Sequence, residues 1–237
     1  MTRRRPPASD PREATPGARA ATRRASTRPA RAAASADAAA ASTVSGAVDA
    51  VARQLFLPEQ RRMRAFLDEP TPVAPGVACP SASTVATLLN ARPPLSGQRV
   101  AVIGEPTGYL AACCAQLGCD VTVEANRPET RDRATAAWAA GARVAGVAHG
   151  RVAWGPRSID AATDTFDHII VGRPIDEPRA RTLLERLDPG HGVLVAPTSD
   201  TDTSRLVVWA RSANGVHRVD AGDLSTSRSS AANRQAG

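Results

Sequence analysis

The chain has 237 residues, enough for one domain with an appendage or for two small domains. Its net charge is +7, but residues 1–42 hold nine arginines against three acids, so the rest of the chain is close to neutral. These values argue against a basic nucleic-acid-binding domain, and no apolar run approaches the roughly 20 residues that span a membrane.

Residues 1–42 are rich in Arg, Ala, Pro, Ser and Thr and contain no aromatic residue, Leu, Ile or Val. Such a segment cannot bury enough apolar surface to offset the entropy of ordering it, so we expect a disordered tail. It lacks the continuous apolar stretch of a secretory signal. A solvated tail is favoured over a nucleic-acid or anionic-surface tether and over an organellar transit peptide. We also expect a flexible C-terminus over residues 225–237.

The four cysteines and four histidines show no metal-ligand spacing. No CxxC pair is present, and Cys113 and Cys114 are adjacent on a predicted helix, so we expect neither a metal site nor a disulfide framework. The cysteines are interpreted as small buried hydrophobes in a reducing compartment, the cytoplasm.

Helical patterns begin the folded part of the chain. One starts near Ser45, and a short one covers residues 59–67. Three prolines within residues 70–76 predict a rigid loop. Ser81 or Ser83 is positioned to cap the next helix.

The stretch after residue 97 has the pattern of a nucleotide-binding βαβ unit. An apolar strand over 100–103 ends at Gly104, and a helix begins at Thr107 or Gly108 and is closed by Gly118 as a left-handed C-terminal cap. A second strand ends in Glu124. The helix N-terminus would face a polar ligand, and the acid would accept hydrogen bonds from ribose hydroxyls. The alternative is an ordinary βαβ pair without a ligand.

Strands and helices continue in alternation to the end of the domain, which we place at residues 43–224. The pattern predicts an α/β, doubly wound, mostly parallel seven-stranded sheet with an antiparallel C-terminal hairpin. The remaining predicted elements are a helix over 129–140, strands over 144–147 and 166–171, a helix over 177–187, a strand over 193–196, and the paired strands 206–209 and 216–219. A loop carrying His149 and Trp154 is expected after the strand at 144–147.

Several segments also match sequence motifs, with no gap from Val51 to Tyr109. V-P-R-x-x-F-V-P-E corresponds to residues 51–59, A-Y-x-D-x-P-L-P-I-G-x-G-Q-T-I-S-Q-P to 65–82, E-I-G-T-G-S-G-Y to 102–109, G-D-G-x-x-G-W to 148–154, F-D-x-I-I-V-T-A-A to 166–174, and L-x-x-G-G-x-L-V-x-P to 187–197 with one residue inserted. The chain thereby resembles the protein-L-isoaspartate O-methyltransferase family, which has the Rossmann-like class I methyltransferase fold.

The resemblance implies transfer of a methyl group from S-adenosyl-L-methionine (SAM) to the carboxylate of isoaspartyl residues in proteins or peptides, a protein-repair reaction. Such a displacement needs mainly proximity and orientation, so no acid–base pair is required. The cofactor-binding residues implied by position are Gly104, Glu105, Thr107, Gly108, Glu124 and His149.

The chain departs from the family motifs where they hold the acceptor. The two hydroxyl-bearing positions of T-I-S are Ala78 and Pro80, which leaves Ser81 and Ser83 as the candidate catalytic hydroxyls.

The cofactor motifs depart as well. Pro106 replaces the middle glycine of the loop, and His149 replaces the acid of G-D-G. Glu105 replaces a small hydroxyl residue; a charge about 5 Å from the cofactor carboxylate would cost roughly 3 kcal/mol at an effective dielectric near 20.

Two interpretations follow. The chain is an isoaspartyl methyltransferase, or it is a catalytically degenerate protein of this fold that acts as a binding or regulatory module. A methyltransferase with another acceptor is a third possibility, and a nicotinamide dehydrogenase fits the motifs less well.

Overall fold

The computed structural model describes residues 43–105, 107–124, 132, 135, 136, 152–155, 159, 165–198 and 205–223. The predicted tail and C-terminus, the predicted strand 144–147, Pro106 and His149 lie outside these residues, as does most of the predicted helix 129–140. Within the described part, no helix is both long and apolar enough to cross a membrane.

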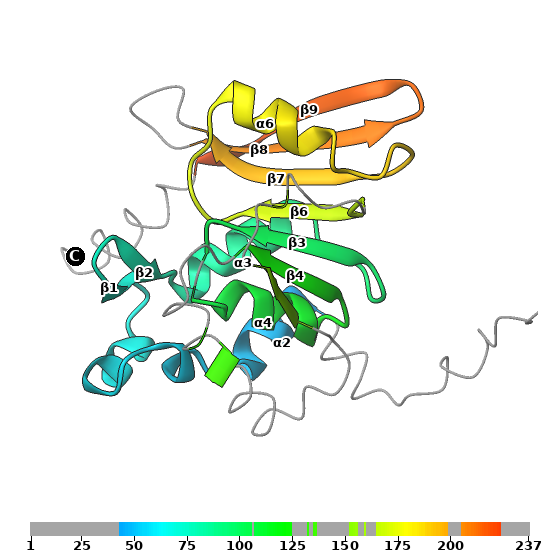
Figure 1. Cartoon of the computed structure of the whole chain (residues 1–237). Coiled ribbons are helices and arrows are strands. Elements are labelled where there is room, and N and C mark those ends of the chain that lie inside the picture. The colour runs from blue at the N-terminus through cyan, green and yellow to red at the C-terminus, as the bar shows by residue number, and fades with distance from the viewer. Residues whose placement is uncertain are drawn as a thin grey trace, which may run out of the picture. The chain divides into compact units, whose positions relative to one another are not determined.

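A seven-stranded sheet runs through the domain in the order β5-β4-β3-β6-β7-β8-β9 (Figure 1). Five of its strands are parallel, and the last two pair antiparallel. The strands are β3 (Arg99–Ile103), β4 (Asp120–Glu124), β5 (Val152–Gly155), β6 (His168–Val171), β7 (Val193–Thr198), β8 (Arg205–Ser212) and β9 (Gly215–Asp223). The predicted sheet with its terminal hairpin is therefore confirmed.

The edge strand beside β4 differs from the prediction. The prediction that Trp154 lies in a loop is wrong, because Trp154 lies in β5 and pairs with Val123. Val152 and Trp154 have high strand propensity, and β4 supplies a free edge for parallel pairing.

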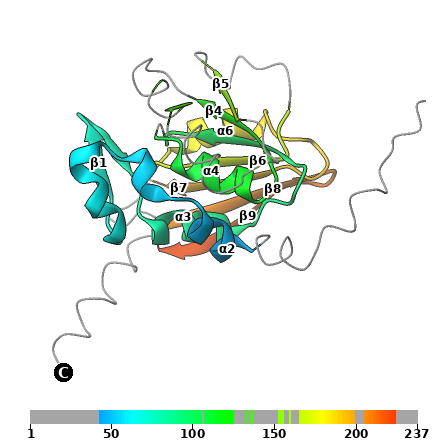
Figure 2. The ribbon, with the colours of Figure 1, turned by 90° about the horizontal axis from the view of Figure 1, so that it is seen from below.

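Helices cover both faces of the sheet (Figure 2). On one face lie α2 (Val44–Ala50), α3 (Ala82–Ala91) and α4 (Tyr109–Gln116), and α6 (Glu177–Leu184) lies on the other. Successive strand residues point to opposite faces. Accordingly Val100 and Val102 pack in the larger core with α2, α3 and α4, whereas Ala101 and Ile103 pack in the core beneath α6.

Side-chain caps begin α2 and α3, and of the two caps predicted for α3, Ser81 or Ser83, Ser81 is the one observed. The Thr43 hydroxyl accepts a hydrogen bond from the backbone N–H of Gly46, and the Ser81 hydroxyl from that of Thr84. Gly108 starts α4 in the left-handed conformation, with φ +87°. The predicted left-handed stop at Gly118 is confirmed by its φ of +88°.

The segment between α2 and α3 lies at one end of the sheet in both views (Figures 1 and 2). It holds the 3₁₀ helices η1 (Arg53–Phe56) and η2 (Glu59–Phe66) and a hairpin of β1 (Thr71–Ala74) and β2 (Val77–Cys79). The rigid loop predicted for residues 70–76 is therefore wrong. A two-stranded hairpin tolerates Pro72, since an edge residue need not donate a ladder hydrogen bond.

Arg53 holds this segment together. Its side chain is buried, and its guanidinium donates hydrogen bonds to the Thr71 hydroxyl and to six backbone carbonyl oxygens. The shortest contacts are 2.7 Å to Glu69, 2.8 Å to Pro80 and 3.0 Å to Leu67. The remaining acceptors are the carbonyl oxygens of Arg64, Ala65 and Cys79. One cation thus joins η2, β1, β2 and the start of α3.

We expect Arg53→Lys to lower the free energy of unfolding by about 3 kcal/mol, because an ammonium cannot satisfy the acceptors that surround the planar guanidinium. Chemical denaturation measures the change. The matched control is Arg62→Lys, on the exposed side of η2, which should change stability by less than about 0.5 kcal/mol. Equal stability of the two variants would contradict the role given to Arg53.

Candidate functional site

The sheet has one topological switch point, between β3 and β6. From β3 the chain continues to β4 on one side, whereas β6 leads to β7 on the other. In open α/β sheets, ligands bind outside the carboxyl ends of the strands at such a point. The residues at this edge are Gly104 and Glu105 after β3, Glu124 at the end of β4, and Arg173 after β6.

The connections that leave β3 and β6 press against each other. The Gly172 N–H donates to the Ile103 carbonyl at 2.8 Å. A Cβ added at Gly172 would lie 2.8 Å from the Glu105 Cβ, so a side chain does not fit there. A Cβ at Gly104, whose φ is +69°, would lie 2.6 Å from the Arg173 Cγ. The surface of Gly104 is therefore covered by the side chain of Arg173.

Glu105 turns inward, beneath the loop that it begins. It is only 3% exposed, and its carboxylate accepts hydrogen bonds from the N–H groups of Thr107 (2.9 Å), Gly108 (3.1 Å) and Leu110 (3.2 Å). The Thr107 hydroxyl also hydrogen-bonds to it. The carboxylate thus satisfies donors at the N-terminus of α4 that would otherwise be free for a ligand.

The environment of Glu105 acts on its acidity in two opposing ways. Burial raises the pKa of the carboxyl, and the hydrogen bonds from Thr107, Leu110 and Gly108 offset this only in part. Thr107, predicted to contact a cofactor, is itself 5% exposed and engaged with Glu105. Both side chains set the path of the loop from inside.

Glu124 lies at the carboxyl end of β4, where the sequence places a ribose-binding acid. Its side chain is 8% exposed, and its carboxylate lies 3.8 Å from the Arg179 guanidinium on α6. The start of α6 is held by Asp176, which accepts from the Arg179 N–H at 2.9 Å. Two cations therefore lie at this edge of the sheet, Arg173 from the β6–α6 connection and Arg179 from the start of α6.

The two candidate hydroxyls differ in their availability. Ser81 is 2% exposed, and its hydroxyl caps α3 while contacting the hydroxyls of Thr84 (2.8 Å) and Ser83 (3.0 Å). Ser83 is half-buried, and its N–H donates to the Asp68 carboxylate at 3.0 Å. Ser81 is therefore a buried helix cap, whereas Ser83 is only partly buried.

Two contacts join this hydroxyl-bearing segment to the loop after β3. The rings of Phe56 and Tyr109 pack with centroids 5.6 Å apart. Burial and, as a smaller effect, the charge of Glu105 raise the pKa of the Cys79 thiol to about 12, so β2 lies within electrostatic reach of the loop. The predicted acceptor segment and the predicted cofactor loop are therefore neighbours.

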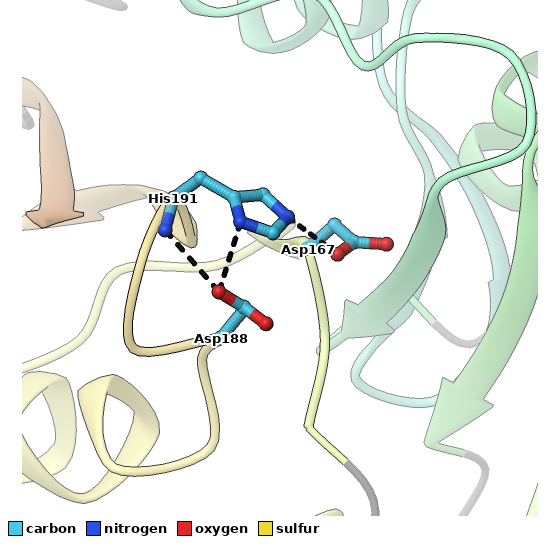
Figure 3. A group of neighbouring side chains, drawn as sticks. All are labelled: Asp167, Asp188 and His191. Carbon is cyan, nitrogen blue, oxygen red and sulfur yellow. Dashed lines mark hydrogen bonds and ion pairs between the residues drawn. The ribbon is translucent and has the colours of Figure 1, made fainter.

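A second polar cluster lies elsewhere in the domain (Figure 3). The His191 ring lies between two carboxylates, 2.9 Å from Asp188 and 3.0 Å from Asp167. Asp167 also accepts from the Arg99 N–H, and Asp188 from the Gly190 N–H. The cluster sits at the amino ends of β3, β6 and β7, opposite the switch-point edge. These contacts hold the turn before β7 against the start of β6, so we interpret the cluster as structural.

Sequence reasoning missed three arginines of the site. Arg53 stands at the arginine of V-P-R, a signal that was available in the motif. Arg173 occupies an alanine position of F-D-x-I-I-V-T-A-A, which could have marked it as unusual. Arg179 has no local signal, because its contact with Glu124 joins residues far apart in the chain.

The comparison with known proteins agrees with this arrangement. The family profile described as protein-L-isoaspartate(D-aspartate) O-methyltransferase matches residues 33–223. The chain belongs to this family. A protein-L-isoaspartate O-methyltransferase of Methanopyrus kandleri is 30% identical over 204 residues, which cover 81% of this chain and 85% of that protein.

Other relatives match in part or in fold. Protein-L-isoaspartate O-methyltransferase 1 of Rhodopseudomonas palustris strain HaA2 is 37% identical over 97 residues, which cover 41% of this chain and only 40% of that protein. The structure of a β-aspartate methyltransferase of this kind from Plasmodium falciparum, in complex with S-adenosyl-L-homocysteine, superimposes with a TM-score of 0.61. It is 18% identical and covers 76% of this chain and 87% of that one, which confirms the class I methyltransferase fold.

The acid of this loop stands at a different position from the acid of the family motif. The family motif E-I-G-T-G-S-G-Y carries its acid where this chain has the fully buried Val102. Compared with that motif, the chain has no acid at position 102 in β3 and carries one three residues later, at Glu105.

The stability contributed by Glu105 should depend on pH. Its folded-state pKa lies above the ordinary 4.5, so the unfolded chain loses the proton first as pH rises. The free energy of unfolding of the native protein minus that of Glu105→Gln is then largest below pH 4.5, and it falls as pH rises through the folded-state pKa. Denaturation at a series of pH values measures this. Glu177→Gln, exposed on α6, is the control. A difference independent of pH, or one that grows in favour of the native protein, would refute the assignment.

Proposed function

We propose that the protein transfers the methyl group of SAM to the carboxylate of isoaspartyl residues in proteins or peptides. One observation carries the proposal. The chain belongs to the family, and at its switch point Gly104 and Glu124 lie at the carboxyl ends of the adjacent strands β3 and β4. The four described cysteines are free and buried, which suits work in a reducing compartment such as the cytoplasm.

The residues at the switch point fit the cofactor. Glu124 offers carboxylate oxygens to ribose hydroxyls, and Gly104 offers a surface without a Cβ. The Arg173 stem that covers Gly104 belongs to an exposed, flexible side chain, so a ligand can displace it at little cost. When bound, SAM supplies an activated methyl group, and the protein needs only to hold the acceptor in line with it.

The position of Glu105 removes the repulsion that the sequence predicts between its charge and the cofactor carboxylate. A carboxylate aimed at the cofactor would repel its carboxylate, but this one is buried and bonded to the backbone of its own loop. Neither the described residues nor the comparisons favour the degenerate binding module over the enzyme.

The acceptor side of the proposed site is built on Ser83. Arg53 fixes the chain that precedes Ser83 by donating to the carbonyl oxygens of Pro80 and of Ala65 in η2, and Ser81 caps the helix that carries Ser83. Ser83 is then presented at the first turn of α3, next to Asp68. We assign to Ser83 the task of hydrogen-bonding the acceptor, in place of the hydroxyls lost at positions 78 and 80.

Methyl transfer is tested with two peptides of one sequence, one containing isoaspartate and the other aspartate. We expect incorporation of labelled methyl groups into the isoaspartyl peptide alone. Ser83→Ala should lower kcat/KM by about tenfold, the effect of losing one hydrogen bond, with little change in stability. Ser81→Ala should instead cost about 1 kcal/mol of stability, because it removes a helix cap. No incorporation by a folded, SAM-binding protein would refute the proposed activity.

Binding of SAM can be tested separately. Loss of charge-assisted bonds from Glu124 to ribose hydroxyls should weaken SAM binding by about one to two orders of magnitude in Glu124→Ala. Isothermal titration measures the affinity. Arg179→Ala, which removes the neighbouring cation but keeps the carboxylate, is the control for general disturbance of the site. Unchanged affinity in a folded Glu124→Ala protein would place the nucleoside elsewhere.

A further inference from the structure

The side chain of Arg173 lies over the glycine of the candidate cofactor loop. Its Cγ, Cδ and Nε would be 2.6, 2.9 and 3.0 Å from a Cβ placed on Gly104. Arg173 is exposed, and within the part of the chain that the structure describes no hydrogen bond or ion pair engages its guanidinium. A flexible cation is therefore held at the carboxyl end of β3 by packing alone.

The loop next to it has few donors left for an anion. The N–H groups of Thr107, Gly108 and Leu110 all donate to the Glu105 carboxylate, and the Thr107 hydroxyl does so too. In other proteins such N–H groups are the usual anion-binding donors of a strand–loop–helix connection. Here a carboxylate of the chain has taken them.

These donors are therefore not free for a negatively charged group that approaches Gly104, and a cation beside the loop would compensate for them. Arg179 is not suited to this, because it lies against Glu124. The Glu105 charge, although buried, also makes the loop less favourable for an anion than an uncharged side chain would. Arg173 is the cation that lies directly on the surface in question, and a guanidinium can bind a carboxylate through two parallel hydrogen bonds.

We infer that Arg173 binds the carboxylate of the amino-acid end of SAM and replaces the loop N–H groups that Glu105 occupies. The inference rests on the proposed function, since it assumes that SAM binds at the switch point. It assigns a ligand-binding role to a residue that stands at an alanine position of the family motif. Glu105 thus accepts hydrogen bonds from the backbone N–H groups of the loop, and the Arg173 guanidinium donates to the ligand in their place.

The test uses two ligands that differ only in the carboxylate, SAM and decarboxylated SAM, titrated into the full chain. The native protein should bind SAM about ten- to a hundredfold more tightly than the decarboxylated ligand, as expected for a charge-assisted pair. In Arg173→Ala this preference should collapse to within about threefold, while affinity for the decarboxylated ligand stays the same. Arg173→Lys should retain part of the preference, since it keeps the charge and loses the fork.

The control is Arg181→Ala, which removes an exposed arginine of α6 that pairs with Glu177. It should leave both affinities unchanged, and thermal unfolding checks that every variant folds.

Three results would overturn the inference. An equal loss of affinity for both ligands in Arg173→Ala would make the residue structural. A preference for SAM that survives the substitution would place the carboxylate on other donors. Tighter binding of both ligands would make Arg173 merely a cover, and would leave the proposed function standing. If neither the native protein nor Arg173→Ala binds either ligand, the proposed function fails together with the inference.

Discussion

The carboxylate of Glu105 sets the geometry of the switch point. It is buried, and it is accommodated because three backbone N–H groups and a hydroxyl of the same loop donate to it. These bonds fix the route from β3 into α4 and bring the Glu105 Cβ so close to Gly172 that the connection after β6 must follow the loop. Arg173 comes to lie over Gly104 for the same reason.

The acceptor side of the site follows the same physical rule. Arg53 is a buried cation whose donors are satisfied mostly by the carbonyl oxygens of the segment that holds η2, β1 and β2. A carboxylate surrounded by N–H groups thus orders the loop after β3, and a guanidinium surrounded by carbonyl oxygens orders the segment between α2 and α3. The Phe56–Tyr109 contact joins the segment that Arg53 orders to the start of α4.

The sequence predicted what depends on local pattern. Apolar strand runs, the caps at Ser81 and Gly118, and the order of elements follow from periodicity and from short-range chemistry. The hairpin at 71–79 was missed because its strands are held by Arg53, through contacts of 18 and 26 residues in sequence separation. The inward turn of Glu105 could not be predicted either, because a sequence does not show whether a loop carboxylate faces solvent or its own backbone. Arg173 and Arg179 reach the site only through the fold.

The most direct test of this account is a crystal structure of the protein with S-adenosyl-L-homocysteine. The account predicts the ribose at Glu124, the Glu105 carboxylate still bonded to the N–H groups of Thr107, Gly108 and Leu110, and the Arg173 guanidinium moved from Gly104 onto the ligand carboxylate. A structure in which Glu105 swings out and the ligand carboxylate binds the freed N–H groups would contradict it. So would a nucleoside bound away from the carboxyl ends of β3 and β4.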